Sequence, residues 1–225
     1  MTGPLTLAIA TATEQVGVAL GRAGGQVASI QLQQGRRHGE VLAPAIESLT
    51  ALTRTPLADV ELIAVDTGPG LFTGLRVGVA TAKALAGALG LQVAACSSLE
   101  LLAGPHRSAG RGVVSVVDAR RGEVFWCIYG PDRIGEPRVT PPEELVSQLR
   151  SCGCQMIATG DGARRYAAQL EVVDGVTIAG PEHDHPSPVV LVEMAAGRAV
   201  LSPEKITPEY MRGADVRIGW EQRDG

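Results

Sequence analysis

Aromatic residues are scarce in this chain of 225 residues, which has only two phenylalanines, two tryptophans and three tyrosines. Three of them, Phe125, Trp126 and Tyr129, fall in one short strand-like segment. Little therefore remains for a platform on which nucleic-acid bases could stack. No long basic run is present either, and the net charge is −4. If nucleic acid is involved, we expect a partner to provide most of the contacts.

Cysteine pairs with the spacing of a metal site are also lacking. The four cysteines are Cys96, Cys127, Cys152 and Cys154. The last two form C-x-C rather than C-x-x-C, and no second pair follows them, so we interpret all four as reduced packing residues. The sequence begins without a basic segment and a long apolar run, and its most apolar stretch, 77–96, is rich in Ala and Gly. We therefore expect a cytoplasmic protein without a signal sequence or a membrane span.

The order of apolar patterns repeats in the two halves of the chain. Each half reads as three strands, a helix, a strand, a helix, a strand and a helix. In the first half we expect strands at 5–10, 16–21, 26–33, 61–66 and 91–96, and helices at 38–53, 71–89 and 97–103. In the second half we expect strands at 112–118, 123–130, 133–139, 155–160 and 176–180, and helices at 140–150, 163–170 and 187–201. This pattern predicts two α/β modules with mixed sheets covered by helices.

The modules are expected to divide into 1–104 and 105–225, with the last helix able to pack back on the first module. Two helix starts are marked by local signals. Thr140 as N-cap with Glu143 forms a predicted capping box, with Pro141 at the first helical position. Ser187 and Pro188 mark the start of the last helix in the same way.

The segment "GPGLFTGLRVG", 68–78, joins a strand to a helix through a glycine-rich turn. It lacks the Lys of a phosphate-binding P-loop and the third Gly of a dinucleotide fingerprint. Two interpretations stay open: an anion site on exposed backbone N–H groups, or glycines that only permit a tight turn. The residues that we expect to contact an anion or nucleotide in the first case are Thr11, Gly68, Gly70 and Asp118.

The helix that follows carries a stripe of very small residues at a spacing of four, namely Gly74, Gly78, Ala82 and Ala86. Each interior glycine costs a helix about 1 kcal/mol relative to alanine, and close approach of another helix would compensate through dispersion contacts. The spacing does not say whether that neighbour lies in this chain or in another. Because most of the helix circumference is apolar, we favour an interface with another protein chain. Gly78→Leu is then predicted to weaken association.

The stretch 62–103 closely resembles the TsaB (YeaZ) family, a bacterial member of the actin/hexokinase-like (ASKHA) superfamily. The family pattern G-P-G-x-F-T-G-L-R is matched from Gly68 to Arg76. Looser similarity is found at 36–46, 116–126 and 208–212 and at "LAIATATEQVGVAL" near the start. The resemblance implies the ASKHA fold, here two similar βββαβαβα modules with mixed sheets flanked by helices.

The resemblance also implies a function. Proteins of this family bind and activate the catalytic paralogue TsaD, and with the ATPase TsaE the complex installs threonylcarbamoyl (t6A) on the adenosine beside the anticodon of ANN-decoding tRNAs. A homodimer through the same face is implied as well. The implied interface comprises His38, Leu42, Ala45, Phe72, Thr73, Gly74, Arg76, Val77, Gly78, Thr81, Ala82 and Leu85.

Catalytic groups of its own are not expected in this chain. In the paralogue two metal-binding histidines, H-x-x-x-H, follow the strand after the glycine-rich helix, but the corresponding stretch here, "CSSLELL", has none. Most family members have Asp where this chain has Ala10. We therefore expect no catalytic residue, no metal site and no cofactor bound by this chain alone, with ATP or ADP and Mg²⁺ only in the complex. The alternative is an ASKHA-type ATPase or phosphotransferase that uses the cleft between the modules.

Two further histidine-containing features are interpreted conservatively. "EHDH", 182–185, lies between prolines and is expected to be a solvated loop cluster rather than a metal site. His38 is expected at a helix start or on the surface, close to the interface. The sequence assigns no role to the tail after Arg212, including Trp220.

Overall fold

The first of two α/β modules is built on a six-stranded mixed sheet. This computed structural model describes residues 3–33, 35, 37–109, 111–130 and 134–211. The strand order in the first sheet is β11-β5-β4-β1-β2-β3. The strands are β1 (Thr6–Ala10), β2 (Gln15–Gly21), β3 (Val27–Gln33), β4 (Leu62–Asp66), β5 (Val93–Cys96) and β11 (Val200–Leu201). Strand β4 is parallel to β1 and β5, whereas the other pairs are antiparallel.

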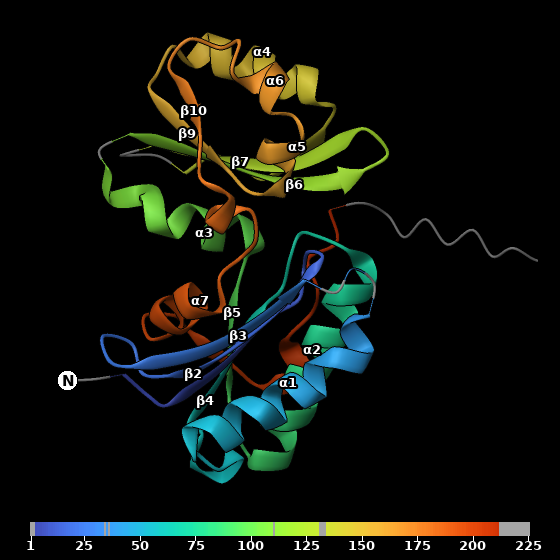
Figure 1. Cartoon of the computed structure of the whole chain (residues 1–225), viewed down its shortest axis with the longest axis vertical. Coiled ribbons are helices and arrows are strands. Elements are labelled where there is room, and N and C mark those ends of the chain that lie inside the picture. The colour runs from blue at the N-terminus through green and yellow to red at the C-terminus, as the bar shows by residue number, and fades with distance from the viewer. Residues whose placement is uncertain (1–2, 34, 36, 110, 131–133, 212–225) are drawn as a thin grey trace, which may run out of the picture.

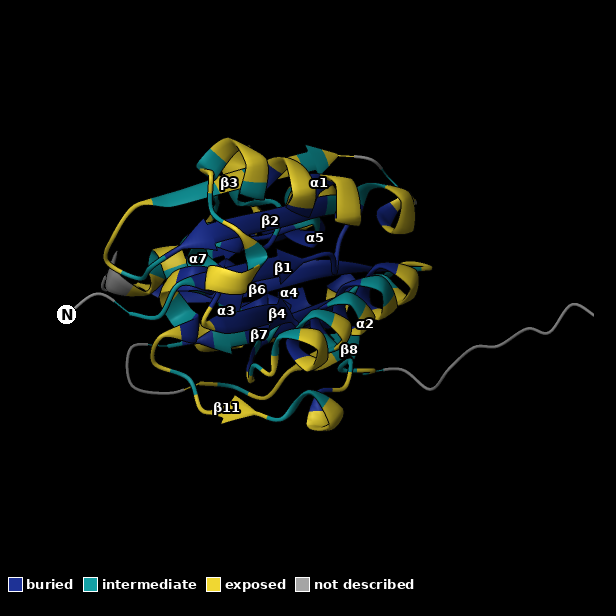
Figure 2. Cartoon of the chain, turned by 90° about the horizontal axis from the view of Figure 1, so that it is seen from below, coloured by how far each residue is buried: buried dark blue, intermediate teal, exposed yellow. Residues whose placement is uncertain are grey.

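Helices cover both faces of this sheet (Figures 1 and 2). Helices α1 (His38–Thr53) and α2 (Phe72–Leu89) lie on one face, and α3 (Ser98–Ala103) and α7 (Pro188–Ala195) lie on the other. The alternation of side chains along β1 explains the two cores. Leu7 and Ile9 point toward α1 and α2, whereas the smaller Ala8 points toward α7.

The second module contains a five-stranded sheet in the order β10-β9-β6-β7-β8. Its elements are β6 (Gly112–Arg120), β7 (Glu123–Tyr129), β8 (Arg138–Thr140), α4 (Pro142–Cys152), β9 (Met156–Thr159), α5 (Asp161–Arg165), α6 (Ala167–Leu170) and β10 (Val176–Ile178). Helices α4, α5 and α6 pack on one face, and α3 packs on the other. Because α3 contributes to cores of both modules, it ties them together (Figure 1).

Short 3-10 helices complete the chain: η1 (Leu57–Asp59), η2 (Gly104–Ala109), η3 (Pro181–His183) and η4 (Pro203–Lys205). After η3 the chain returns to the first module, where α7 packs on the first sheet and β11 pairs with β5. Beyond η4 it runs along α2, where Lys83 Nζ donates to the carbonyl of Ile206 at 3.2 Å. The segment from Ser187 onward thus lies with the first sheet.

The predicted element order and the predicted fold class of two mixed sheets flanked by helices are confirmed, but α7, the last helix predicted for the second module, packs on the first sheet. Within the part of the chain that the structure describes, no helix is long and apolar enough to cross a bilayer. The Ser187 cap is confirmed, since its Oγ accepts from the Val190 N–H. The helix expected at 163–170 is interrupted at Tyr166, and the helix expected at 187–201 ends at Ala195.

The capping box predicted at Thr140 is wrong. Thr140 is the last residue of β8, and its Oγ1 accepts a hydrogen bond of 2.9 Å from Trp126 Nε1 on the neighbouring strand. Helix α4 begins at Pro142 without a side-chain cap. The hydroxyl stabilises the sheet here, because it is the partner that the buried indole N–H requires.

Candidate functional site

The small-residue stripe of α2 faces the protein's own first strand. A Cβ atom at Gly74 would overlap the carbonyl of Thr11, and one at Gly78 would overlap the Thr11 hydroxyl. Thr11 is fully buried, and its Oγ1 donates to the Gly74 carbonyl at 2.8 Å. Ala82 and Ala86 are fully buried as well. The stripe therefore permits close packing of α2 on the end of β1, and its interpretation as the contact ridge for a partner is wrong.

Other residues of the predicted interface are also interior. Leu42 and Ala45 are 1% and 4% exposed and belong to the core between α1 and the first sheet. His38 is the first residue of α1, as expected, but it is buried rather than on the surface. Its Nε2 lies 2.7 Å from the Thr13 carbonyl, which fixes the turn between β1 and β2. Because a carbonyl oxygen only accepts, Nε2 carries the proton.

Five residues at a spacing of four form the exposed ridge of α2: Phe72, Arg76, Ala80, Ala84 and Ala88. Phe72 is 40% exposed. Among the other predicted interface residues, Thr73 is exposed and Val77, Thr81 and Leu85 are half-buried. Sequence reasoning missed the three alanines of the ridge, because the glycines drew attention to the opposite side. Helix α2, which packs beside α1, therefore exposes mainly short side chains along this ridge, and Figure 2 shows exposed residues on both helices.

The C-terminal segment fixes one end of this ridge. The ring of Tyr210 lies 5.3 Å from that of Phe72, and the Arg76 guanidinium lies 3.8 Å above the Phe72 ring. Arg76 Nε also donates to the Tyr210 hydroxyl at 3.1 Å. The cation above the Phe72 ring and the Tyr210 ring tilted at 37° against it stabilise one another, so the side chains at the start of the ridge are held in place.

The glycine-rich turn is packed against the turn that follows β1. Gly68 adopts a φ of 103°, which favours glycine, and its N–H donates to Asp66 Oδ1 at 3.0 Å. A Cβ at Gly70 would overlap the backbone of Ala12, and the Leu71 N–H donates to the Ala12 carbonyl at 2.6 Å. These contacts favour the tight-turn interpretation over the anion site.

Asp66, at the end of β4, is a fully buried carboxyl group. Its Oδ1 accepts from Ser98 Oγ at 2.6 Å as well as from Gly68, whereas its Oδ2 has no hydrogen-bond partner among the described residues. Burial raises the pKa of Asp66 to about 7, since the ionised form loses its solvation, and the nearby Glu209 adds to this effect. Asp66 is therefore substantially protonated at neutral pH.

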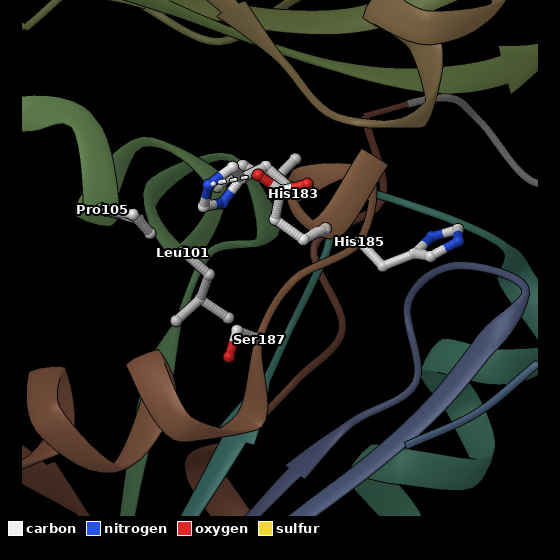
Figure 3. Close-up of a pocket in the computed structure, with 7 residues that line it drawn as sticks. Leu101, Pro105, His183, His185 and Ser187 are labelled. Atoms are coloured by element: carbon white, nitrogen blue, oxygen red, sulfur yellow. Dashed lines mark ion pairs between the residues drawn. The ribbon is translucent and has the colours of Figure 1, made fainter. Parts of the chain in front are cut away.

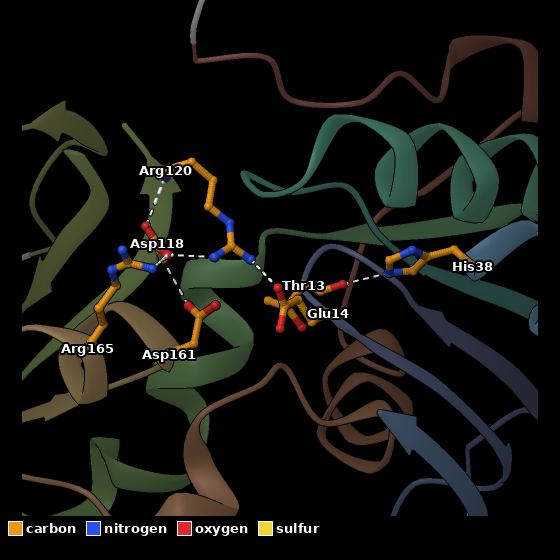
Figure 4. A network of polar contacts seen from close by, with 7 residues as sticks. All are labelled: Thr13, Glu14, His38, Asp118, Arg120, Asp161 and Arg165. Atoms are coloured by element: carbon orange, nitrogen blue, oxygen red, sulfur yellow. Dashed lines mark hydrogen bonds and ion pairs between the residues drawn. The ribbon is translucent and has the colours of Figure 1, made fainter. Parts of the chain in front are cut away.

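A network of charged groups connects the two modules, as drawn in Figure 4. Asp118 is buried, and its Oδ2 accepts from Arg120 at 3.0 Å and from Arg165 at 3.1 Å. Arg120 also forms an ion pair with Glu14 of the first module. The Asp118 N–H donates to Asp161, and burial raises the pKa of Asp161 to about 7. Asp118 thus has two guanidinium partners, which makes it a poor ligand for a further cation.

The "EHDH" segment lies near a small pocket beside η2, which Figure 3 shows. The rings of His106 and His183 meet edge to face with centroids 4.4 Å apart. Asp184 is paired with Arg164 at 3.2 Å, and Glu182 lies 3.6 Å from His183. Among the described residues, no group of three or more His, Cys, Asp or Glu side chains is arranged to hold a metal ion.

The cysteines divide into two classes. Cys96 and Cys127 are buried, as packing residues should be, but Cys152 and Cys154 are exposed at the end of α4. The packing interpretation is therefore wrong for this second pair. Arg212 and Trp220 lie outside the described residues.

Known proteins with similar sequences align with nearly the whole length of this chain. A family model described as TsaD, tRNA N6-adenosine threonylcarbamoyltransferase, matches residues 26–145. The tRNA threonylcarbamoyladenosine biosynthesis protein TsaB of Escherichia coli K12 is 29% identical over 97% of this chain and 98% of its own length. The TsaB protein of Bacillus subtilis 168 is 28% identical over 95% of this chain and 96% of its own length.

A solved structure shares the fold. The crystal structure of a Pseudomonas aeruginosa protein, described as uncharacterized with similarity to the peptidase YeaZ, superposes with a TM-score of 0.79 at 28% identity. The superposition covers 93% of this chain and all of that one. The similarity therefore extends over both modules.

Proposed function

We propose that this chain is a non-catalytic subunit in the biosynthesis of threonylcarbamoyladenosine in tRNA. The chain belongs to the TsaD family and, within it, to the TsaB (YeaZ) group. In this proposal the chain binds and activates the catalytic paralogue TsaD. Together with the ATPase TsaE, the two modify the adenosine beside the anticodon of ANN-decoding tRNAs, and tRNA is bound through the complex.

The observation that carries this proposal is the exposed ridge of α2. Ala80, Ala84 and Ala88 expose short side chains along three successive turns, with Phe72 and Arg76 at the start. Short side chains let a second helix approach closely and form many dispersion contacts. Apolar side chains exposed on successive helical turns are suited to a protein–protein contact. The proposed contact face is thus the outer side of α1 and α2 rather than the glycine stripe.

The residues where the two modules meet support the non-catalytic part of the proposal. Ala10, at the end of β1, has no carboxylate for a metal, and Asp118 is already paired with Arg120 and Arg165. A nucleotide-bound Mg²⁺ would need oxygen ligands that are free to coordinate it. This arrangement does not favour the alternative of an ATPase or phosphotransferase.

Activation would operate through differential binding. A partner that binds one of two TsaD conformations more tightly shifts the population toward it by the difference in binding free energy. The same apolar face also suits a second copy of this chain. Homodimer and heterodimer would then compete for one surface, so adding TsaD should dissociate the homodimer.

Reconstitution of the tRNA modification from purified subunits tests the proposal. With TsaD, TsaE, the threonylcarbamoyl donor and tRNA present, modification should depend on this chain. Modification at the full rate in its absence would contradict the proposed activating role. Turnover of ATP by the chain alone would instead support the enzymatic alternative.

A further inference from the structure

Two exposed cysteines lie together at the end of α4, the helix of the second module shown at the top of Figure 1. Cys152 is the last residue of the helix, and Cys154 follows after Gly153. The first module, with α1 and α2, lies at the opposite end of the molecule (Figure 1). The pair is therefore separate from the proposed contact face.

The backbone brings the two thiol groups into contact. Gly153 closes the helix with a left-handed φ of 59°, so the chain reverses direction between the two cysteines. A Cβ on Gly153 would meet no atom within 4 Å, so the backbone conformation, not packing, requires glycine here. The Cys152 thiol donates to the Cys154 sulfur at 3.0 Å, and the Cys154 thiol lies 3.1 Å from the Cys152 carbonyl.

We propose that Cys152 and Cys154 form a thiol–disulfide exchange site whose substrate is a small disulfide such as that of a tripeptide thiol. In the first step, the thiolate of one cysteine attacks a sulfur of the substrate, and one substrate thiolate leaves and takes up a proton. In the second step, the other cysteine loses its proton and attacks the mixed disulfide, and the second substrate thiolate leaves. The protein dithiol is oxidised to a disulfide, and the substrate disulfide is reduced to two thiols.

The hydrogen bond between the cysteines sets the order of attack. The pKa of Cys152 is raised, mainly because its proton is held by the contact with Cys154. Cys152 therefore keeps its proton in the first step, and we assign the first attack to Cys154, whose sulfur accepts the hydrogen bond from Cys152. Cys152 is then the residue that closes the intramolecular disulfide.

The site is suited to reversible exchange rather than to structural stabilisation. A disulfide across one intervening residue closes a very short loop and constrains the unfolded chain little. Exposed disulfides of this kind are the ones that are readily reduced again. The buried cysteines contrast with this pair: burial raises the pKa of Cys96 to about 11 and also raises that of Cys127. Such thiols are protonated and shielded from solvent, so they should not react.

The test uses the full-length reduced protein and oxidised glutathione. After acid quenching, mass spectrometry should show the loss of two hydrogen atoms, mapped to the peptide that contains residues 152–154, without a stable glutathione adduct. Dithiothreitol should restore the starting mass. Cys152→Ser should stop at a glutathione adduct on Cys154, whereas Cys154→Ser should react at least roughly tenfold more slowly.

A backbone variant separates ring closure from thiol exposure. Gly153→Val disfavours the left-handed conformation by enough to slow closure roughly tenfold, so the mixed disulfide should accumulate. Stable adducts on both cysteines of the native protein, or no reaction at either, would overturn the proposal. Binding of TsaD by the oxidised and reduced proteins reports on the proposed function separately, since the cysteines lie far from α1 and α2.

Discussion

The carboxylate of Glu14 and the guanidinium of Arg120 form an ion pair that joins the two modules. Glu14 lies in the turn after β1, and Arg120 ends β6, the corresponding strand of the second module. The same guanidinium neutralises the buried Asp118. Arg120 therefore has two roles: it makes a partly exposed contact with the other module and a contact with a buried carboxylate in its own module.

These two roles predict different effects on stability. Glu14→Gln removes an ion pair whose side chains are 44% and 40% exposed, so it should lower the free energy of unfolding by no more than about 1 kcal/mol. Arg120→Ala removes the same ion pair and also leaves the buried Asp118 with one guanidinium partner fewer. This variant should therefore lower the free energy of unfolding by about 1–3 kcal/mol. Urea unfolding of both variants measures the difference. Equal effects would show that the Asp118 contact contributes nothing.

Two glycines of α2 should respond to alanine in opposite directions. A methyl group at Gly78 would overlap Thr11 and displace its hydroxyl from the Gly74 carbonyl, so Gly78→Ala should lower the unfolding free energy by about 1–3 kcal/mol. Gly87 is exposed, and a methyl group there would meet no atom within 4 Å. Gly87→Ala should raise the stability by about 0.5–1 kcal/mol through helix propensity.

Thermal or urea denaturation of the two glycine variants provides the measurement. Gly78→Ala that is as stable as the wild type would mean that the stripe is not tightly packed on β1. The variant Gly78→Leu, predicted from the sequence to weaken association, should instead disrupt the fold itself.

The buried Asp66 should make stability depend on pH. Its pKa rises from the ordinary 3.8 to about 7 on folding because burial disfavours the charged form, so the folded state binds the proton more tightly than the unfolded state. Its contribution is fully present below about pH 4 and is lost as the pH rises through about 7. Asp66→Asn should therefore reduce the fall of the unfolding free energy between about pH 4 and 7. A smaller fall should remain, because the pKa of Asp161 is also raised to about 7.

The control for this measurement is Asp174→Asn, which changes an exposed carboxyl group of the second module. This variant should retain the wild-type fall in stability between about pH 4 and 8. If Asp66→Asn retained the same fall, Asp66 would be ionised in the folded protein.

The isolated chain should bind Mg-ATP weakly or not at all. The glycine turn is filled by the backbone of Ala12, and the Asp118 carboxylate is paired with Arg120 and Arg165. Isothermal titration calorimetry of the purified protein with Mg-ATP is the measurement. Stoichiometric binding with turnover would contradict this prediction and favour the ATPase alternative.

The sequence predicted the element order well because apolar periodicity depends on local spacing, and both modules follow it. It could not assign the faces of α2. Gly74, Gly78 and Ala82 share a spacing of four with Ala80, Ala84 and Ala88, and only the fold shows that the first set meets β1. Likewise, Thr140 has the pattern of a helix cap, but its partner is Trp126 on an adjacent strand, a contact that local sequence does not encode.

The same limit applies to the ion pair between the modules and to the cysteine pair. Glu14 and Arg120 are distant in sequence and meet only because the two modules face each other. Cys152 and Cys154 stand out in the sequence as C-x-C, but their contact depends on the left-handed conformation of Gly153.

TsaD is proposed to dock on the outer face of α2, and binding of TsaD to a ridge variant tests this most directly. Ala84→Arg adds bulk and charge to an exposed helical position without disturbing the core, and Ala168→Arg makes the same change on exposed α6 of the second module. Calorimetric titration with TsaD should show that Ala84→Arg weakens binding at least tenfold, about 1.4 kcal/mol, while Ala168→Arg binds like the wild type. Wild-type affinity for Ala84→Arg would contradict the proposed docking face.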